Sequence, residues 1–293
     1  MKIARLLIPL CVTVLGISLF LKKEACEQNY VRLPVSFFPF VDRPTVQIEI
    51  EGKKHSVLLD LGSSHPIDLQ KRFLQKVKNK QPDGLSDYVG IRGKKYPTER
   101  FRLPEVKLLN LTVQGLVGYE ENLDFVSDAR TWQSTGIWDQ FKDQLELYTI
   151  HGRIGWTLFN ETACFFDFPN SALYLAKDLV SLINEAGCSF DNFIQVPFEI
   201  HKWGIALHFE TDFGINLFVL DTGATRSIFR RSSDSKEVVT RKLIAGDHDF
   251  GGMQFKLLDF TDQMECDGIL GIDFFKAHAV CLDFHNRVAL IQK

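Results

Sequence analysis

The chain has 293 residues, of which 45% are hydrophobic and 24% charged, and its formal net charge is −3. These proportions are those of an ordinary globular protein of about two domains. Lys and Arg form no stripe interleaved with aromatic residues, so we do not expect nucleic acid as a partner.

An apolar run occupies residues 6–21, between the short basic flank MKIAR and the pair Lys22 and Lys23. The run is long for the core of a secretory signal and short for a spanning helix, which needs about 20 residues. Residues 1–26 are therefore either a cleaved signal peptide or an uncleaved transmembrane anchor. In both cases we expect the protein to be exported or membrane-anchored, in the cell envelope, the periplasm or the secretory pathway.

Two stretches of the chain match each other: VLLDLGSSHPI at residues 57–67 and FVLDTGATRSI at residues 218–228. In both, an apolar run leads into an Asp, Asp60 or Asp221, and a Gly follows two positions later. An ionised Asp at the end of a core strand costs several kcal/mol unless a partner compensates it. Each Asp is therefore a candidate partner for the other.

A second match follows each of these stretches, at residues 152–175 and 268–291. Gly155 falls over Gly271, and Asp167 falls over Asp283. The sequence therefore predicts two copies of one unit, an N-terminal lobe over 27–180 and a C-terminal lobe over 190–293. The first copy is longer, and we place most of its insertion in residues 118–147.

Local patterns favour strands almost throughout. Residues 44–60 and 203–221 both read as strand, turn and strand, and each hairpin ends at one of the two Asp residues. Helical patterns are sparse and fall at residues 67–79 and 178–187. We therefore predict an all-β fold.

These motifs resemble those of the aspartic protease superfamily, in both its two-lobed pepsin-like and its retropepsin-like forms. The likeness covers residues 44–293 and rests on the paired Asp-x-Gly motifs with their matching Gly segments, such as ILGIDFF after Asp221. It implies two pseudo-symmetric barrel lobes with a cleft between them. It also implies a monomeric endopeptidase that hydrolyses extended segments of a peptide or protein substrate without a metal or cofactor.

The resemblance assigns roles to residues of both motifs. Asp60 and Asp221 would form a dyad that shares one proton and activates a water molecule. Gly62 and Gly223 would leave room for the carboxylates. Thr222 would tie the two loops together through its hydroxyl, whereas Leu61, at the matching position, has none.

A hydroxyl beside one Asp predicts where the shared proton resides. Ser63 follows Asp60-Leu-Gly and is expected to donate to the Asp60 carboxylate, while Ala224 offers Asp221 nothing. A hydrogen bond to the charged form lowers a pKa. We therefore expect the proton mostly on Asp221.

Three further features leave alternatives open. Because Leu61 lacks a hydroxyl, the second candidate function is a catalytically weak or inactive bilobal peptide-binding module of the cell envelope. The stretch YVGIRGKKY at residues 88–96 is either a flap over the cleft, with Tyr88 or Tyr96 as its aromatic residue, or an ordinary surface hairpin. His278, Cys281 and His285 have a metal-like spacing, but a strand would send the first two to opposite faces, so we predict no metal site.

Overall fold

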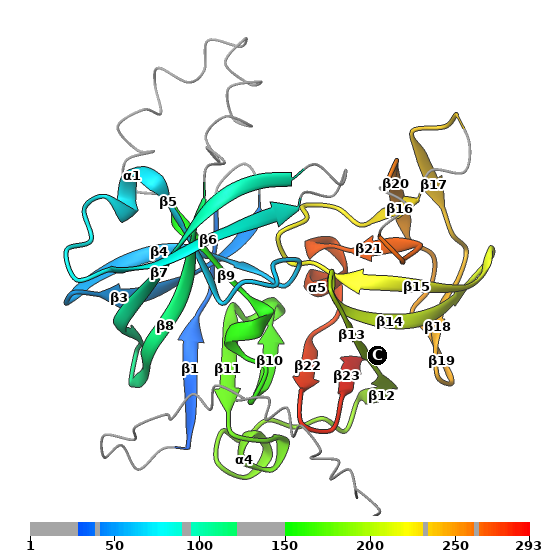
Figure 1. The fold of residues 1–293 in the computed structure, drawn as a ribbon. Helices are drawn as coiled ribbons and strands as arrows, with labels where there is room; N and C mark the ends of the chain where they lie inside the picture. Colours follow the sequence, from blue (N-terminus) through cyan, green and yellow to red (C-terminus); the bar gives the residue numbers. More distant parts are fainter. Residues whose placement is uncertain (1–28, 39–41, 90–94, 122–149, 231–233, 261–263) are drawn as a thin grey trace, which may run out of the picture.

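The computed structural model describes residues 29–38, 42–89, 95–121, 150–230, 234–260 and 264–293. These residues form two lobes of curled β-sheet on either side of a third sheet, with few and short helices (Figure 1). The predicted all-β, two-lobed fold is confirmed. No helix among these residues is long and apolar enough to cross a membrane, and the apolar run at 6–21 lies outside them.

The first lobe is built on an eight-stranded sheet. Its strands, in spatial order, are β2 (Ser36–Phe38), β3 (Arg43–Ile50), β4 (Lys53–Asp60), β9 (Ile150–Gly155), β5 (Ile67–Gln70), β8 (Leu111–Glu121), β7 (Lys95–Leu108) and β6 (Gln81–Val89). The predicted hairpin of β3 and β4 turns through Glu51 and Gly52, both at positive φ. Glycine reaches this conformation at little cost, which is why the turn falls there.

The second lobe repeats this arrangement on a nine-stranded sheet. Its main path runs through β17 (Glu237–Val239), β20 (Gln254–Leu258), β16 (Ile228–Arg230), β21 (Gly268–Leu270), β15 (Gly214–Leu220), β14 (Gly204–Thr211), β18 (Leu243–Ala245) and β19 (His248–Asp249), and β13 (Glu199–His201) pairs with β14. The predicted hairpin of β14 and β15 closes where Thr211 pairs with Gly214.

A six-stranded sheet joins the two copies. Its order is β1 (Tyr30–Pro34), β11 (Ala172–Ala176), β10 (Ala163–Asp167), β22 (Val280–Asp283), β23 (Val288–Gln292) and β12 (Phe193–Pro197). At its centre β10 of the first copy pairs antiparallel with β22 of the second, with Phe165 opposite Cys281. Beside this junction Phe275 packs on Phe166 and Phe168 at centroid distances of 6.1 and 5.9 Å. Much of the large Phe content therefore fills the shared core.

The helices are shorter than the sequence patterns predict. In the described part of the chain they are α1 (Lys71–Leu74), α4 (Leu179–Asn184) and α5 (Ile272–Ala277), with single 3₁₀ turns η2 (Trp156–Leu158) and η3 (Phe168–Asn170). The predicted helix at 67–79 is wrong in its first part, because residues 67–70 are all buried and pair as β5 with β8 and β9. The helix predicted at 178–187 is present as the shorter α4, whose first turn is capped by the Asp178 carboxylate.

The insertion in the first copy is only partly visible. Residues 118–121 continue β8, and residues 122–149 lie outside the described part of the chain.

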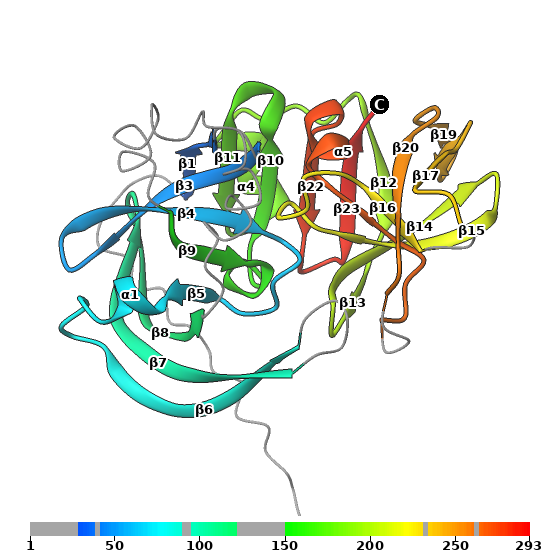
Figure 2. The ribbon, with the colours of Figure 1, turned by 90° about the horizontal axis from the view of Figure 1, so that it is seen from above.

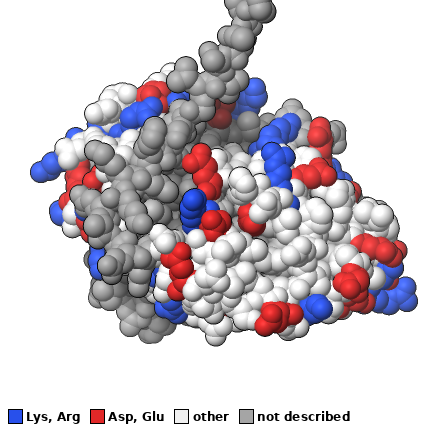
Figure 3. Space-filling view, turned by 90° about the horizontal axis from the view of Figure 1, so that it is seen from below, with Lys and Arg blue, Asp and Glu red and all other residues white. Residues whose placement is uncertain are grey.

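Below the six-stranded sheet, on the face where α4 lies, a broad area carries few charged side chains and is bordered by acidic and basic ones (Figure 3).

Candidate active site

Each lobe delivers one Asp at the end of a hairpin strand. Asp60 is the last residue of β4, and Asp221 follows the last residue of β15. Of the parallel neighbours of these strands, β9 ends at the matched Gly155 and β21 ends one residue before the matched Gly271. A Cβ on Gly155 would lie 2.2 Å from the Ser63 carbonyl oxygen, and one on Gly271 would lie 2.7 Å from the Arg226 carbonyl carbon. Glycine is required at both positions because the Asp loops fold back onto them.

The structure brings Asp60 and Asp221 together across the boundary between the lobes. A Cβ on Gly62 would lie 2.5 Å from Asp221 Cγ, and a Cβ on Gly223 would lie 2.6 Å from Asp60 Oδ1. Each glycine therefore makes room for the carboxyl group of the opposite loop. The two carboxyl groups therefore lie close to each other at the boundary between the loops.

This contact makes Asp221 a proton-holding group. Burial, then the negative charge of Asp60 and the hydrogen bond to it, raise the pKa of Asp221 to about 7. The backbone N–H groups of Gly223 and Ala224 donate to its Oδ1 at 2.8 and 3.1 Å and offset part of this rise. Two carboxylates this close cannot both ionise easily, so the pair keeps one proton up to neutral pH.

Thr222 ties the loops together from one side. Its Oγ1 donates to the Leu59 carbonyl oxygen at 2.8 Å and accepts from the Leu61 N–H at 3.0 Å. Both bonds are buried. Leu61 fills the matching position with an apolar side chain that is 1% exposed and belongs to the core. The hydroxyl hydrogen bonds that the resemblance implies are therefore made by Thr222 of the second lobe. Leu61 has no hydroxyl and makes no equivalent bond to the second loop.

The Ser63 hydroxyl does not donate to the Asp60 carboxylate. Its hydroxyl donates instead to Asp68 Oδ2 at 3.0 Å. The prediction was wrong because Asp68, at the start of β5, presents a second acid on the same side of the loop. Ser63 therefore positions Asp68 and not the dyad.

The donor to Asp60 is Arg153, on β9. Its Nη1 donates to Asp60 Oδ2 at 3.0 Å, and its Nε donates to Asp68 Oδ2 at 2.8 Å. Arg153 is 8% exposed and Asp60 8%. This functional residue was missed, although the repeat carried a signal: GRIG at 152–155 aligns with GILG at 268–271, which puts a charge where the second copy has Ile269.

The register of the strands confirms that Arg153 and Ile269 are equivalent. Leu58 pairs with Arg153, Val219 pairs with Ile269, and Leu58 and Val219 each stand two residues before a dyad Asp. Across the next pairing, Asp68 lies opposite Arg153 as Ile228 lies opposite Ile269. The match of Ile67 with Ile228 is therefore shifted by one residue, because the first loop is one residue longer.

Two acids and a histidine complete the cluster around Arg153. Burial alone would raise the pKa of Asp68. The charge of Arg153 and the hydrogen bond with His65, whose Nδ1 lies 2.6 Å from Asp68 Oδ1, outweigh burial and lower this pKa. Burial raises the pKa of Glu121 to about 8, helped by the charges of Asp68 and Asp60 and opposed by Arg153. Glu121 Oε1 lies 3.3 Å from Arg153 Nη2, and neither of its buried oxygens has a hydrogen-bond partner.

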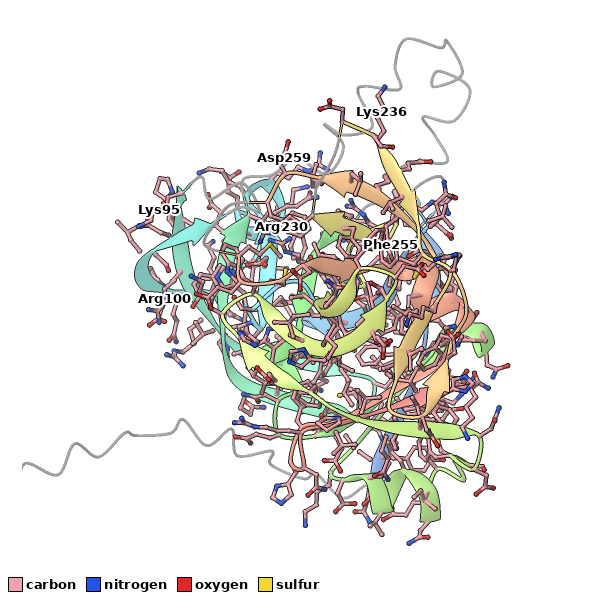
Figure 4. All side chains as sticks on the ribbon, turned by 90° about the vertical axis from the view of Figure 1, so that its right-hand side faces the viewer. Lys95, Arg100, Arg230, Lys236, Phe255 and Asp259 are labelled. Atoms are coloured by element: carbon pink, nitrogen blue, oxygen red, sulfur yellow. The ribbon has the colours of Figure 1, made fainter. Side chains whose placement is uncertain are left out.

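The predicted flap forms a hairpin, but its tip is outside the described residues. Strands β6 and β7 pair with Tyr88 opposite Tyr96, and both figures of the ribbon show the hairpin reaching from the first lobe toward the second (Figures 1 and 2). Lys95 and Arg100 project from it at one edge of the molecule (Figure 4). Nothing described fixes where the two Tyr side chains point, so the flap stays a prediction.

A chain of contacts links this hairpin to the dyad. The Arg100 guanidinium lies 5.9 Å from the centre of the Tyr119 ring, and His65 stacks on the same ring at 3.7 Å. His65 contacts Asp68, which contacts Arg153. The dyad is thus connected to β7 through side chains of the first lobe.

A separate cavity of about 530 Å³ lies in the second lobe, between α5 and β20. Arg226, Lys256 and His278 are among its lining residues, and neither dyad Asp is. Within the described residues no group of three His, Cys, Asp or Glu side chains is arranged to hold a metal ion.

Comparison with known proteins identifies the fold. No family model and no curated protein matches the sequence. Among solved structures, basic 7S globulin from soybean is similar over 90% of this chain and 95% of its own, with a TM-score of 0.57 and 9% identity. Conglutin gamma, a basic 7S globulin from lupine seeds, is similar over 91% and 95%, with a TM-score of 0.57 and 10% identity. At these identities the likeness shows the fold alone.

Proposed function

We propose that this chain is an aspartic endopeptidase that hydrolyses extended peptide segments with Asp60 and Asp221. The observation that carries the proposal is the approach of these carboxyl groups across the two lobes, each into the space beside the other loop's glycine. The raised pKa of Asp221, about 7, supports it. A pair of this kind holds one acid and one base at the same point, which is what metal-free peptide hydrolysis needs.

The reaction follows from these two protonation states. Asp60 takes a proton from a water molecule, whose oxygen attacks the scissile carbonyl carbon, while Asp221 gives its proton to the carbonyl oxygen. The tetrahedral intermediate then collapses: the C–N bond breaks, the leaving nitrogen takes the proton from Asp60, and Asp221 regains its own. One water is consumed, one acid and one amine are released, and the dyad returns to its starting state.

A second candidate is the peptide-binding module without useful catalysis. Two observations favour it: Leu61 returns no tie to the second loop, and Arg153 occupies an oxygen of Asp60. The two seed globulins lend it some weight, since neither is named for a catalytic activity.

Digestion of a peptide library, followed by mass spectrometry, separates the two candidates. The endopeptidase should produce internal cleavages that a statine-type transition-state mimic blocks and that Asp221→Asn abolishes. Peptides that are retained by the parent protein but never cut between about pH 3 and 8 would support the binding module instead.

We further propose that the folded part acts as a monomer on the outer side of a membrane, tethered or released through residues 1–26. The apolar run at 6–21 supports this. Full-length protein should stay with the membrane fraction after a carbonate wash, or else its mature form should begin near residue 27. Soluble protein with an intact N-terminus would contradict both forms.

A further inference from the structure

We infer that Arg153 is a positioning residue that assigns the roles in the dyad, keeping Asp60 as the base and leaving the proton to Asp221. This inference rests on the proposed function and goes beyond it, because the repeat places an apolar residue, Ile269, at the equivalent position of the second lobe. The two halves of the dyad are therefore built differently.

The hydrogen bonds of the two carboxyl groups show this asymmetry directly. Asp60 accepts at both oxygens, from Gly62 N–H at Oδ1 (3.1 Å) and from Arg153 Nη1 at Oδ2 (3.0 Å). Asp221 accepts two backbone N–H groups at Oδ1. Within the described residues, no N–H donor reaches its Oδ2. A proton on Asp60 would weaken its acceptance of these bonds, whereas Asp221 Oδ2 can carry one without such a loss.

The charge of Arg153 acts in the same direction. A guanidinium in contact with a carboxylate favours its ionised form, and the effect is strong for groups that are 8% exposed, as both of these are. In the second lobe, Ile269 lies instead in an apolar cluster with Val219, Phe260 and Met264. No comparable charge therefore favours ionisation of Asp221.

Arg153 is itself held in place by the acid opposite it in the sheet. Its Nε donates to Asp68, which also accepts from the Ser63 hydroxyl and contacts His65. Two hydrogen bonds from one planar fork fix the orientation of the guanidinium, which a Lys ammonium cannot reproduce. Ser63 therefore acts on the dyad indirectly, through Asp68 and Arg153.

Charged and titratable groups face Asp60 from each packed element. They are Asp221 from the second lobe, Arg153 on β9, Asp68 on β5 behind it, and Glu121 on β8. His65 touches Asp68 on its far side. With Asp68 ionised and Glu121 largely protonated at neutral pH, Arg153 is a cation shared by the charged members of this cluster, and Arg43 adds a weaker charge near Glu121.

The test compares Arg153→Gln, which removes the charge, with Arg153→Lys, which keeps it, and uses Ile269→Met as the matched control in the other lobe. The acidic limb of the kcat/KM profile should move upward by about one to three pH units in the Gln variant, because the base loses its cation. It should move less than half as far in the Lys variant and stay in place in the control. An acidic limb that stays in place in both Arg153 variants would overturn the inference.

Carboxyl ¹³C NMR gives a readout that needs neither cleavage nor a mutation. In the parent protein, the carboxyl carbon that titrates near pH 7 should belong to Asp221. A near-neutral titration assigned to Asp60 would overturn the inference even if the protein is an active peptidase. Conversely, a protein that cleaves nothing but titrates at Asp221 would refute the proposed function and leave the role of Arg153 intact.

Discussion

Thr222 reaches across the boundary between the lobes to Leu59, with its Oγ1 donating to the Leu59 carbonyl oxygen at 2.8 Å. Thr222 Oγ1 also accepts from the Leu61 N–H, so one hydroxyl satisfies two backbone groups of the other lobe. Because Leu61 cannot reciprocate, this single side chain carries the hydroxyl tie between the loops. The stability of the dyad region therefore depends on it more than it would in a symmetric site.

Thr222→Val should remove this tie at nearly constant shape. A buried donor and a buried acceptor lose their partner, which costs about 1–3 kcal/mol of unfolding free energy. Urea unfolding followed by tryptophan fluorescence measures the loss. Thr225→Val, in the same loop and partly exposed, should change stability by less than about 0.5 kcal/mol. Equal losses in the two variants would contradict the role given to Thr222.

Gly62→Ala should disrupt the dyad without straining the backbone. The added Cβ would meet Asp221 Cγ at 2.5 Å, so the carboxyl groups must separate. We expect kcat/KM to fall at least about 100-fold, the scale of a small misplacement of reacting groups. Gly246→Ala is the control: that turn has a φ of +60° and nothing within 4 Å. It should lose about 1 kcal/mol of stability and keep its activity.

Asp221 should make stability fall as pH rises toward neutrality. Folding raises its pKa from the ordinary 3.8 to about 7, so the folded state holds this proton more tightly than the unfolded state. The contribution of Asp221 is then present below about pH 4 and lost progressively up to about pH 7. In urea unfolding from pH 4 to 8, Asp221→Asn should gain stability over the parent across this window. Curves that stay parallel would count against the raised pKa.

The raised pKa of Glu121 should give folding stability a second, separable dependence on pH. Burial raises its pKa to about 8, so its ionisation in the folded state is costly and its contribution to stability declines between about pH 4.5 and 8. Glu121→Gln should therefore become more stable than the parent by over about 1 kcal/mol at pH 8, and less so at pH 5. Glu120→Gln is the matched control. That side chain accepts from Lys71 at 2.8 Å, so its replacement should bring no such gain.

The parts of the site that the sequence predicts are those that the repeat duplicates. Asp60 and Asp221, with their glycines, stand at the same offsets in both copies, and the structure brings them together. Arg153 was missed because it stands at a position where the copies differ, and a comparison that looks for likeness passes over such positions. Its misfit with Ile269 was visible in the alignment and is the signal that would have found it.

The errors have local physical causes. Ser63 was assigned to Asp60 by sequence proximity, but Asp68 returns to it through the pairing of β5 with β9, which no short-range pattern reveals. The helical spacing at 67–79 was overridden because burial of residues 67–70 between two strands outweighs local propensity. The hairpin predicted at 88–96 is present in the pairing of β6 with β7, and its tip lies outside the described part of the chain.

The most direct test of the account is the cleavage of one peptide by Asp60→Asn, Asp221→Asn and the double variant. If the two carboxyl groups act as a single unit, each single variant should lose at least about 1,000-fold in kcat/KM, and the double variant should lose no more than either one. Losses that multiply in the double variant would mean that the two residues act separately. A single variant that keeps the parent's activity would contradict the shared dyad.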